Sequence, residues 1–269
     1  MKKILTVFIC LCLNTITFAQ TKKTEIYVIG VVHDKSKILD PDKLFEILNT
    51  IKPDILLQEN DSQQIKEYFD EIRPNSNEQT ATILYLKKYP NTLNLPFEFE
   101  GRNDYRKKNG MVPTDNLTIK ALDSLYQNNK LNAQESAIYK KYADANIQLR
   151  AYTTREFKDM NSKVFDSINK NRQYIQHKEL PKITANNDYF KNKFVVKPNG
   201  EKISLSEGYQ LWCNFWDLRN NSMAINIIKQ ANNYPGKRIV VLTGVQHRYY
   251  LKELLAKYYD GSYTVLDFF

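Results

Sequence analysis

Two of the three histidines in this chain stand in the same short sequence context. Gly30-Val31-Val32-His33 and Gly244-Val245-Gln246-His247 each follow an apolar run with the composition of a buried strand. Glycine permits a tight exit from a strand, and histidine supplies a metal ligand or a base that titrates near neutral pH. The repeated motif favours a functional pair over two histidines that only cap helices or sit at the edge of the core.

A carboxylate occupies a comparable position. Glu59 comes just after the apolar strand expected over residues 54–57, in Leu56-Leu57-Gln58-Glu59-Asn60. There it could ligate a metal ion or act as an acid or base. It could equally be an ordinary charge at a helix N-terminus, stabilised by the helix dipole.

Arg219 falls on an apolar stripe at helical spacing, formed by Trp212, Trp216, Met223 and Ile227. A buried guanidinium is costly unless it is paired, so we expect a protein carboxylate or a substrate group beside it. The alternative is an arginine at the margin of the stripe that reaches water. Asn220 follows directly and could face the same crevice. Replacing Arg219 with Met is expected to keep the fold and abolish activity.

Other candidates carry less signal. Glu98, Glu100 and Arg102 form a polar group after a possible edge strand, where a cleft and a solvated edge are equally compatible with the pattern. His177 lies in a polar helical region and is expected at the surface. Cys213 lies in an apolar helical stretch and is expected to be a buried, inert thiol.

The order of elements predicts an α/β fold with a central, mainly parallel sheet. Strands at 25–29 and 54–57 flank a helix that starts at Asp40-Pro41-Asp42, and strands at 238–242 and 263–266 follow a helix over about 205–232. Residues from about 113 to 200 are expected to form a helical insertion in a single domain. Because loops after parallel strands share one sheet edge, His33, Glu59 and His247 should line one cleft that Arg219 reaches from its helix.

Composition and the N-terminus limit the class of protein. The 269 residues carry a net charge of +9 without a dense basic block, which fits a solvated basic surface better than a nucleic-acid site. Met1-Lys2-Lys3, an apolar stretch to Phe18 and Ala19 read as a secretory signal peptide over residues 1–19. We therefore expect an exported protein, periplasmic or secreted, that starts near Gln20 and has no transmembrane anchor.

These pieces in this order resemble the Tiki/TraB superfamily, which also includes erythromycin-esterase-like and ChaN-like proteins. The matching residues are Gly30 to His33, Glu59, Arg219-Asn220-Asn221-Ser222-Met223, and Gly244 to His247. The resemblance covers residues 24–72 and 205–269. It implies two related α/β halves around one cleft, and metal-dependent peptide cleavage or ester cleavage in some members. ChaN-like members are linked instead to haem or iron binding.

The sequence therefore predicts a hydrolase that cleaves an ester or peptide bond in a small-molecule or peptide substrate. His33 or His247 would be a metal ligand or general base, Glu59 a ligand or proton acceptor, and Arg219 the group that holds a substrate carboxylate or the developing oxyanion. A divalent ion (Mn, Co or Zn) on His33, Glu59 and His247 would lower the pKa of bound water; a metal-free His/Glu pair is the other version. A haem, iron or other ligand carrier without turnover and a non-catalytic regulatory protein remain open.

Overall fold

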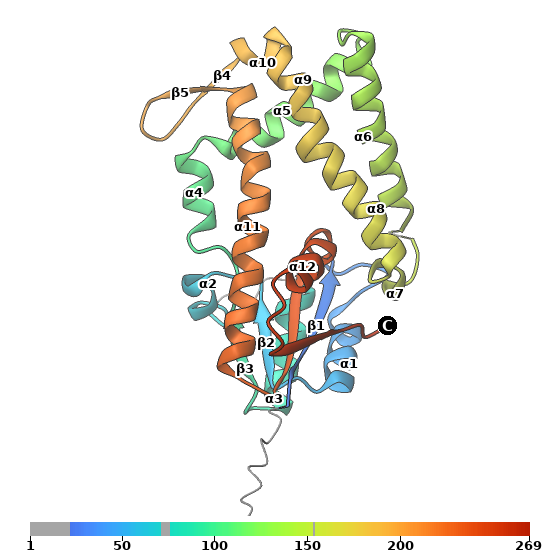
Figure 1. The fold of residues 1–269 in the computed structure, drawn as a ribbon, viewed down its shortest axis with the longest axis vertical. Coiled ribbons are helices and arrows are strands. Elements are labelled where there is room, and N and C mark those ends of the chain that lie inside the picture. The colour runs from blue at the N-terminus through green and yellow to red at the C-terminus, as the bar shows by residue number, and fades with distance from the viewer. Residues whose placement is uncertain (1–21, 71–75, 153) are drawn as a thin grey trace, which may run out of the picture.

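The computed structural model describes residues 22–70, 76–152 and 154–269 (Figure 1). Five parallel strands form the central sheet in the order β3-β2-β6-β1-β7. They are β1 (Thr24–Val31), β2 (Ile55–Gln58), β3 (Leu93–Pro96), β6 (Arg238–Gly244) and β7 (Tyr263–Leu266). The predicted α/β fold with a parallel sheet is confirmed. The C-terminal strand β6 lies between the two N-terminal strands β1 and β2, so the two distant parts of the chain build one sheet.

Helices cover both faces of this sheet, as its doubly buried strands require. Helices α1 (Pro41–Ile51) and α3 (Asn77–Lys88) pack on one face, and α12 (Val245–Lys257) with the C-terminal half of α11 (Leu205–Asn233) packs on the other. Side chains alternate between the two cores along each strand. In β6, for example, Val240 and Leu242 face α1 and α3, whereas Ile239 and Val241 face α11 and α12.

The middle of the chain forms a helical part beyond the carboxyl ends of the strands (Figure 1). Its elements are α4 (Arg102–Lys108), α5 (Met111–Gln127), α6 (Ala133–Tyr152), α7 (Phe157–Met160), α8 (Lys163–Tyr174), a π-helical turn η1 (Ile175–Glu179), α9 (Leu180–Asn186) and α10 (Asp188–Asn192). The sequence predicts helices here only from about residue 113 to 200, so it misses α4 and also the short antiparallel hairpin of β4 (Phe194–Val196) and β5 (Lys202–Ser204).

Helix α11 joins the two parts. A capping box starts it, because the Ser204 side chain accepts from the Glu207 backbone N–H and the Glu207 carboxylate accepts from the Ser204 N–H. Its first half packs with α5 and α9 in a third apolar core, which includes Cys213 at 0% exposure, as predicted for this thiol. Its middle therefore passes the edge of the sheet where the strands end.

No helix among the described residues is long and apolar enough to cross a membrane. The segment expected to be a signal peptide, residues 1–19, lies outside the described part of the chain.

Candidate functional site

The two Gly-x-x-His motifs contact each other across neighbouring strands. Strands β1 and β6 pair with Val31 opposite Gly244. A Cβ on Gly30 would lie 3.1 Å from Cα of Val245, so this glycine lets the start of α12 pack closely on β1. A Cβ on Gly244 would lie 3.2 Å from His33 Nε2. Gly30 thus supports the fold, whereas Gly244 leaves room beside the first histidine.

Arg219 lies at the centre of a buried charged network. Its side chain is 11% exposed, and its Nη2 donates to Glu59 Oε1 at 2.6 Å. Its Nε donates to Glu98 Oε1 at 2.9 Å, and Nη2 also donates to Glu98 Oε2. Burial alone would lower the pKa of Arg219, but the two carboxylates outweigh it and raise the pKa above its usual value. The buried and paired arginine predicted from the helical stripe is confirmed.

Hydrogen bonds fix the tautomer of His247, which is only 6% exposed. The Asn220 amide donates to the Trp216 carbonyl oxygen at 2.7 Å, so its Oδ1 faces His247 Nδ1 at 2.8 Å. Nδ1 must therefore carry the proton, and the bare Nε2 accepts from Arg219 Nη1 at 2.7 Å. Burial and the nearby Arg219 charge lower the pKa of His247 to about 3. At neutral pH this imidazole is neutral and both nitrogens are occupied.

Glu59 uses both carboxylate oxygens within the protein. Oε1 accepts from Arg219, while Oε2 accepts from the Thr243 hydroxyl at 2.8 Å and from the Gly244 backbone N–H at 2.7 Å. Burial by itself would raise the pKa of Glu59, but His247, Arg219 and the Gly244 N–H hold it well below its usual range. Glu59 is therefore a permanent carboxylate at physiological pH.

His33 differs from His247 in exposure, in hydrogen-bond partner and in the direction of its pKa shift. Its side chain is 65% exposed, and Nδ1 lies 2.6 Å from Glu78 Oε1, which leaves Nε2 without a hydrogen-bond partner in the part of the chain that the structure describes. The hydrogen bond to Glu78 outweighs partial desolvation and raises the pKa of His33 above 6.5. The backbone around it is held by the start of α3, since the Asn77 N–H donates to the His33 carbonyl oxygen at 2.8 Å.

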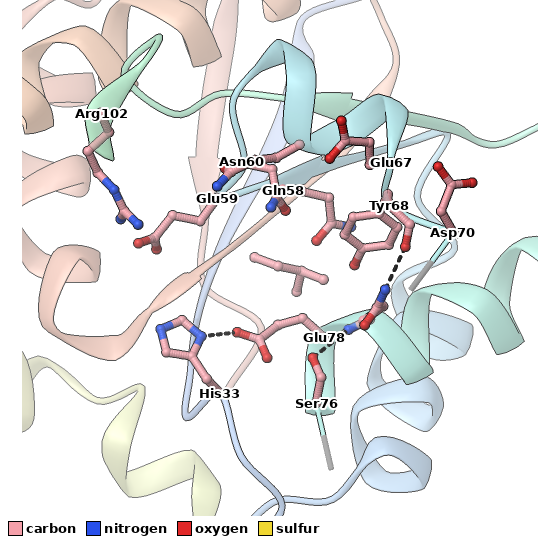
Figure 2. Close-up of a pocket in the computed structure, with 13 residues that line it drawn as sticks. His33, Gln58, Glu59, Asn60, Glu67, Tyr68, Asp70, Ser76, Glu78 and Arg102 are labelled. Carbon is pink, nitrogen blue, oxygen red and sulfur yellow. Dashed lines mark hydrogen bonds and ion pairs between the residues drawn. The ribbon is translucent and has the colours of Figure 1, made fainter. Parts of the chain in front are cut away.

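A cavity of about 530 Å³ opens at this edge of the sheet (Figure 2). His33, Glu59, Glu78 and Arg102 are among its lining residues. Figure 2 shows the Glu59 carboxylate directed toward the Arg102 guanidinium, and the hydrogen-bonded His33–Glu78 pair below them. Arg102 Nη1 donates to Glu98 at 3.2 Å, and its side chain remains 28% exposed. The cavity therefore brings together an imidazole, two carboxylates and a partly exposed guanidinium.

The four residues singled out from the sequence come to one edge of the sheet in two groups. Glu59, Arg219 and His247 are in direct contact, with Asn220 (0% exposed) holding His247. His33 lies across Gly244 from them, and its charge also acts on Glu59. Both histidines lie at the same edge of the sheet, but only His33 and Glu59 are among the residues that line the cavity. His247 and Arg219 are buried beside Glu59 and do not line it, so the cleft expected to be shared by both histidines is not what the cavity shows.

A metal ion shared by His33, Glu59 and His247 does not fit this arrangement of donors. The Nε2 lone pair of His247 accepts from Arg219, and both oxygens of Glu59 accept from protein groups. Among the described residues, no group of three or more His, Cys, Asp or Glu side chains is arranged to hold a metal ion. A divalent ion would have to displace Arg219 from these donors, so metal binding stays a prediction.

The sequence did not single out three side chains of this region. Glu98 was considered only as part of a polar group at the strand edge, yet its side chain is 1% exposed and binds Arg219. Glu78 stands in the first turn of α3 behind the Ser76 cap, a sequence position that gives no sign of His33. The expectation that His177 is at the surface is wrong: it is 3% exposed and packs against Trp212 and Trp216.

The chain matches no family model, no curated protein and no solved structure in the three comparisons made. The resemblance to the Tiki/TraB superfamily therefore stays a prediction, and the chemistry of this site is argued from its own geometry.

Proposed function

We propose that this protein is a hydrolase that cleaves an ester or peptide bond with a water molecule activated by His33. The observation that carries the proposal is the His33–Glu78 pair. Its Nδ1–carboxylate contact of 2.6 Å holds the ring, and the other nitrogen is free at a cavity that also contains Glu59 and Arg102. An imidazole oriented by a carboxylate is a standard arrangement for general-base catalysis.

In the proposed reaction, His33 Nε2 accepts a proton from water as the water oxygen bonds to the substrate carbonyl carbon. Glu78 accepts a hydrogen bond from Nδ1–H and stabilises the imidazolium that forms. The tetrahedral intermediate then collapses, and Nε2–H returns the proton to the leaving alkoxide or amine. Water is added across the bond, so no further reactant is required.

Glu59 and Arg102 have supporting roles in this scheme. Glu59 remains ionised and is too weak a base to keep a proton, but its carboxylate can accept a hydrogen bond from the attacking water. Arg102 is accessible from the cavity and can stabilise the negative charge on the carbonyl oxygen in the transition state. We assign Arg219 and His247 to positioning, since their hydrogen-bonding groups contact Glu59, Glu98 and Asn220.

The test is a hydrolysis screen with chromogenic esters and fluorogenic peptides on the purified mature protein. For any substrate that is turned over, His33→Gln should reduce kcat by about 10²-fold or more. Arg102→Gln should reduce it by about 10²-fold or more if it stabilises the oxyanion. Lys35→Gln, an exposed neighbour of His33 on the same loop, is the matched control and should leave the rate unchanged.

Two further measurements separate the hydrolase from the alternatives. Metal analysis of the same preparation tests for Mn, Co or Zn, and a spectral titration with haem tests for a carrier. No turnover, combined with a Soret band that His33→Gln abolishes, would replace the hydrolase by a haem-binding protein. Absence of turnover, haem binding and metal would favour a regulatory protein.

A further inference from the structure

The helical part presents a histidine to the site from an unusual helical turn. Helix α8 continues into the π turn η1, in which the Leu180 N–H donates to the Ile175 carbonyl oxygen five residues earlier. Pro181 follows at the start of α9. Proline has no N–H, and in a regular α-helix its ring would clash with the carbonyl of the residue four positions before it, which is His177. The wider turn accommodates Pro181 and turns His177 inward; such π turns are frequent at functional sites.

His177 is held there as a neutral ring. It is 3% exposed, and burial together with the Arg172 charge lowers its pKa to about 3. Its Nε2 lies 3.1 Å from Gln173 Oε1, an acceptor that Arg172 also contacts through Nη1. Nε2 therefore carries the proton, which is the opposite tautomer to that of His247. Nδ1 of His177 is buried without a hydrogen-bond partner. Hydrogen bonds alone therefore do not explain why the His177 ring is buried here.

Ring stacking does explain it. The His177 ring stacks on Trp216 with centroids 5.0 Å apart and an interplanar angle of 12°. Trp216 in turn stacks on His247 at 4.4 Å and 21°. Trp216 also acts through its backbone, because its carbonyl oxygen orients the Asn220 amide that fixes the His247 tautomer. Trp216 thus contacts His247 directly through its ring, and its backbone carbonyl orients the Asn220 amide that bonds to His247 Nδ1.

We propose that Trp216 and His177 are positioning residues of the site: they hold the His247 ring in the orientation and tautomer in which Nε2 binds Arg219. The helical part would then determine, through His177 and Trp216, how His247 is oriented toward Arg219. This inference concerns the state of His247 and holds whether or not the protein is a hydrolase, so its test does not depend on turnover.

The test is a long-range ¹H–¹⁵N correlation spectrum of protein labelled with ¹⁵N-histidine, recorded at pH 7. With three histidines in the chain, single His→Gln variants assign every signal. We expect pure Nδ1–H shifts for His247 and pure Nε2–H shifts for His177. Trp216→Leu keeps the backbone carbonyl that orients Asn220 but removes the ring that flanks His247, so the imidazole can tilt away from Asn220 and Arg219. The pure His247 pattern should then give way to averaged or doubled nitrogen shifts, whereas Trp216→Phe, which retains a flat ring, should preserve the pattern.

Phe215→Leu is the matched control, because Phe215 is a buried aromatic on the same helix that packs edge-on against Phe99 and stacks on Tyr105 rather than on a histidine. It should leave the His247 shifts unchanged. Unchanged shifts in folded Trp216→Leu would overturn the proposal for Trp216. His177→Ala should disturb the His247 pattern and His177→Phe should keep it; an undisturbed pattern in His177→Ala overturns the role of His177. If Trp216→Leu does not fold, this second pair decides.

Discussion

His247 accepts a hydrogen bond through Nε2 from the Arg219 guanidinium at 2.7 Å. The lone pair that a general base or a metal ligand would use is therefore occupied by a permanent cation. His33, which has the same local sequence motif, has an exposed ring and is held instead by a carboxylate. Two histidines in matching sequence contexts are thus in opposite chemical situations: His247 is buried and neutral with both nitrogens occupied, and His33 is exposed with Nε2 free.

The pH dependence of turnover should follow His33. The Glu78 hydrogen bond raises the pKa of His33 above 6.5, and the base form is the active one, so kcat/KM should rise with pH through this raised pKa. Glu78→Gln removes the negative charge that favours the imidazolium, so the midpoint should move to lower pH. The limiting rate should also fall, by about 10²-fold, because the ring loses its orientation. A pH–rate profile of each protein measures both effects.

Protonation of His33, which should lower turnover, should stabilise the fold. A folded-state pKa above the unfolded value stabilises the fold below pH 6.5, and this contribution is lost as pH rises through the folded-state pKa. The side chain is largely exposed, so the effect on the free energy of unfolding should be small.

For turnover, a pH–rate profile that is the same in Glu78→Gln and in the wild type would contradict the assignment of His33 as the general base.

Arg219→Met should destabilise the fold, contrary to the expectation from the sequence. The change leaves Glu98, with a side chain 1% exposed, and Glu59 without their main cation. Removing one partner of a buried ion pair costs about 3–5 kcal/mol in unfolding free energy. Urea denaturation measures this cost, and the double variant Arg219→Met with Glu98→Gln should recover part of it. Equal stability of the single variant and the wild type would contradict the buried network.

Gly244→Ala should affect the site more than the fold. Gly244 has φ −53° and ψ 132°, which alanine adopts without strain. The added methyl group would lie 3.2 Å from His33 Nε2 and 3.6 Å from Glu59 Oε2, in the space where the attacking water is proposed. We expect a loss of about 10²-fold in kcat, since small misplacements at a site have effects of this size. Turnover and thermal unfolding of the same sample separate the two effects.

Gly30→Ala provides the comparison. Its Cβ would lie 3.1 Å from Val245 Cα and from Arg248 Cδ, in the packing of α12 on β1. This variant should lose stability because the helix must move. The two glycines of the repeated motif should thus give opposite patterns, and loss of stability rather than of turnover in Gly244→Ala would argue against a water at that position.

Acid should destabilise the protein through its two buried neutral histidines. His177 and His247 have folded pKa values of about 3, against about 6.5 when unfolded. Between these values the unfolded chain binds protons that the folded chain does not, so the unfolding free energy should fall by about 1 kcal/mol per pH unit for each histidine as pH drops below 6.5. His177→Phe should remove one of the two contributions. Urea titrations from pH 7 to pH 4 test this; a slope that is the same in the variant would contradict it.

Export predicts a processed N-terminus. Residues 1–19 have the basic start, apolar stretch and small residue before the cleavage site that a signal peptide requires. N-terminal sequencing of protein recovered outside the cytoplasm should read from Gln20. An intact Met1 on cytoplasmic protein would remove the assignment.

Local sequence patterns predicted the strands β1, β2 and β6 and singled out the polar side chains that follow them, which are His33, Glu59 and His247. The apolar runs of β1, β2 and β6 are each followed by Gly or a polar residue, and loops after parallel strands must share an edge. The helical spacing around Arg219 likewise predicted its burial. Glu78 and Glu98 could not be identified in this way, because their partners lie 45 and 121 positions away in the sequence.

The sequence by itself thus determined which elements form, that their carboxyl ends share an edge, and that Arg219 needs an anion. Only the tertiary structure decided which anions meet Arg219, which histidine keeps a free nitrogen, and that His177 lies inside. The physical reason is that hydrophobic periodicity is a local property of the chain, whereas the pKa and tautomer of a side chain depend on burial and on hydrogen-bond partners from distant segments.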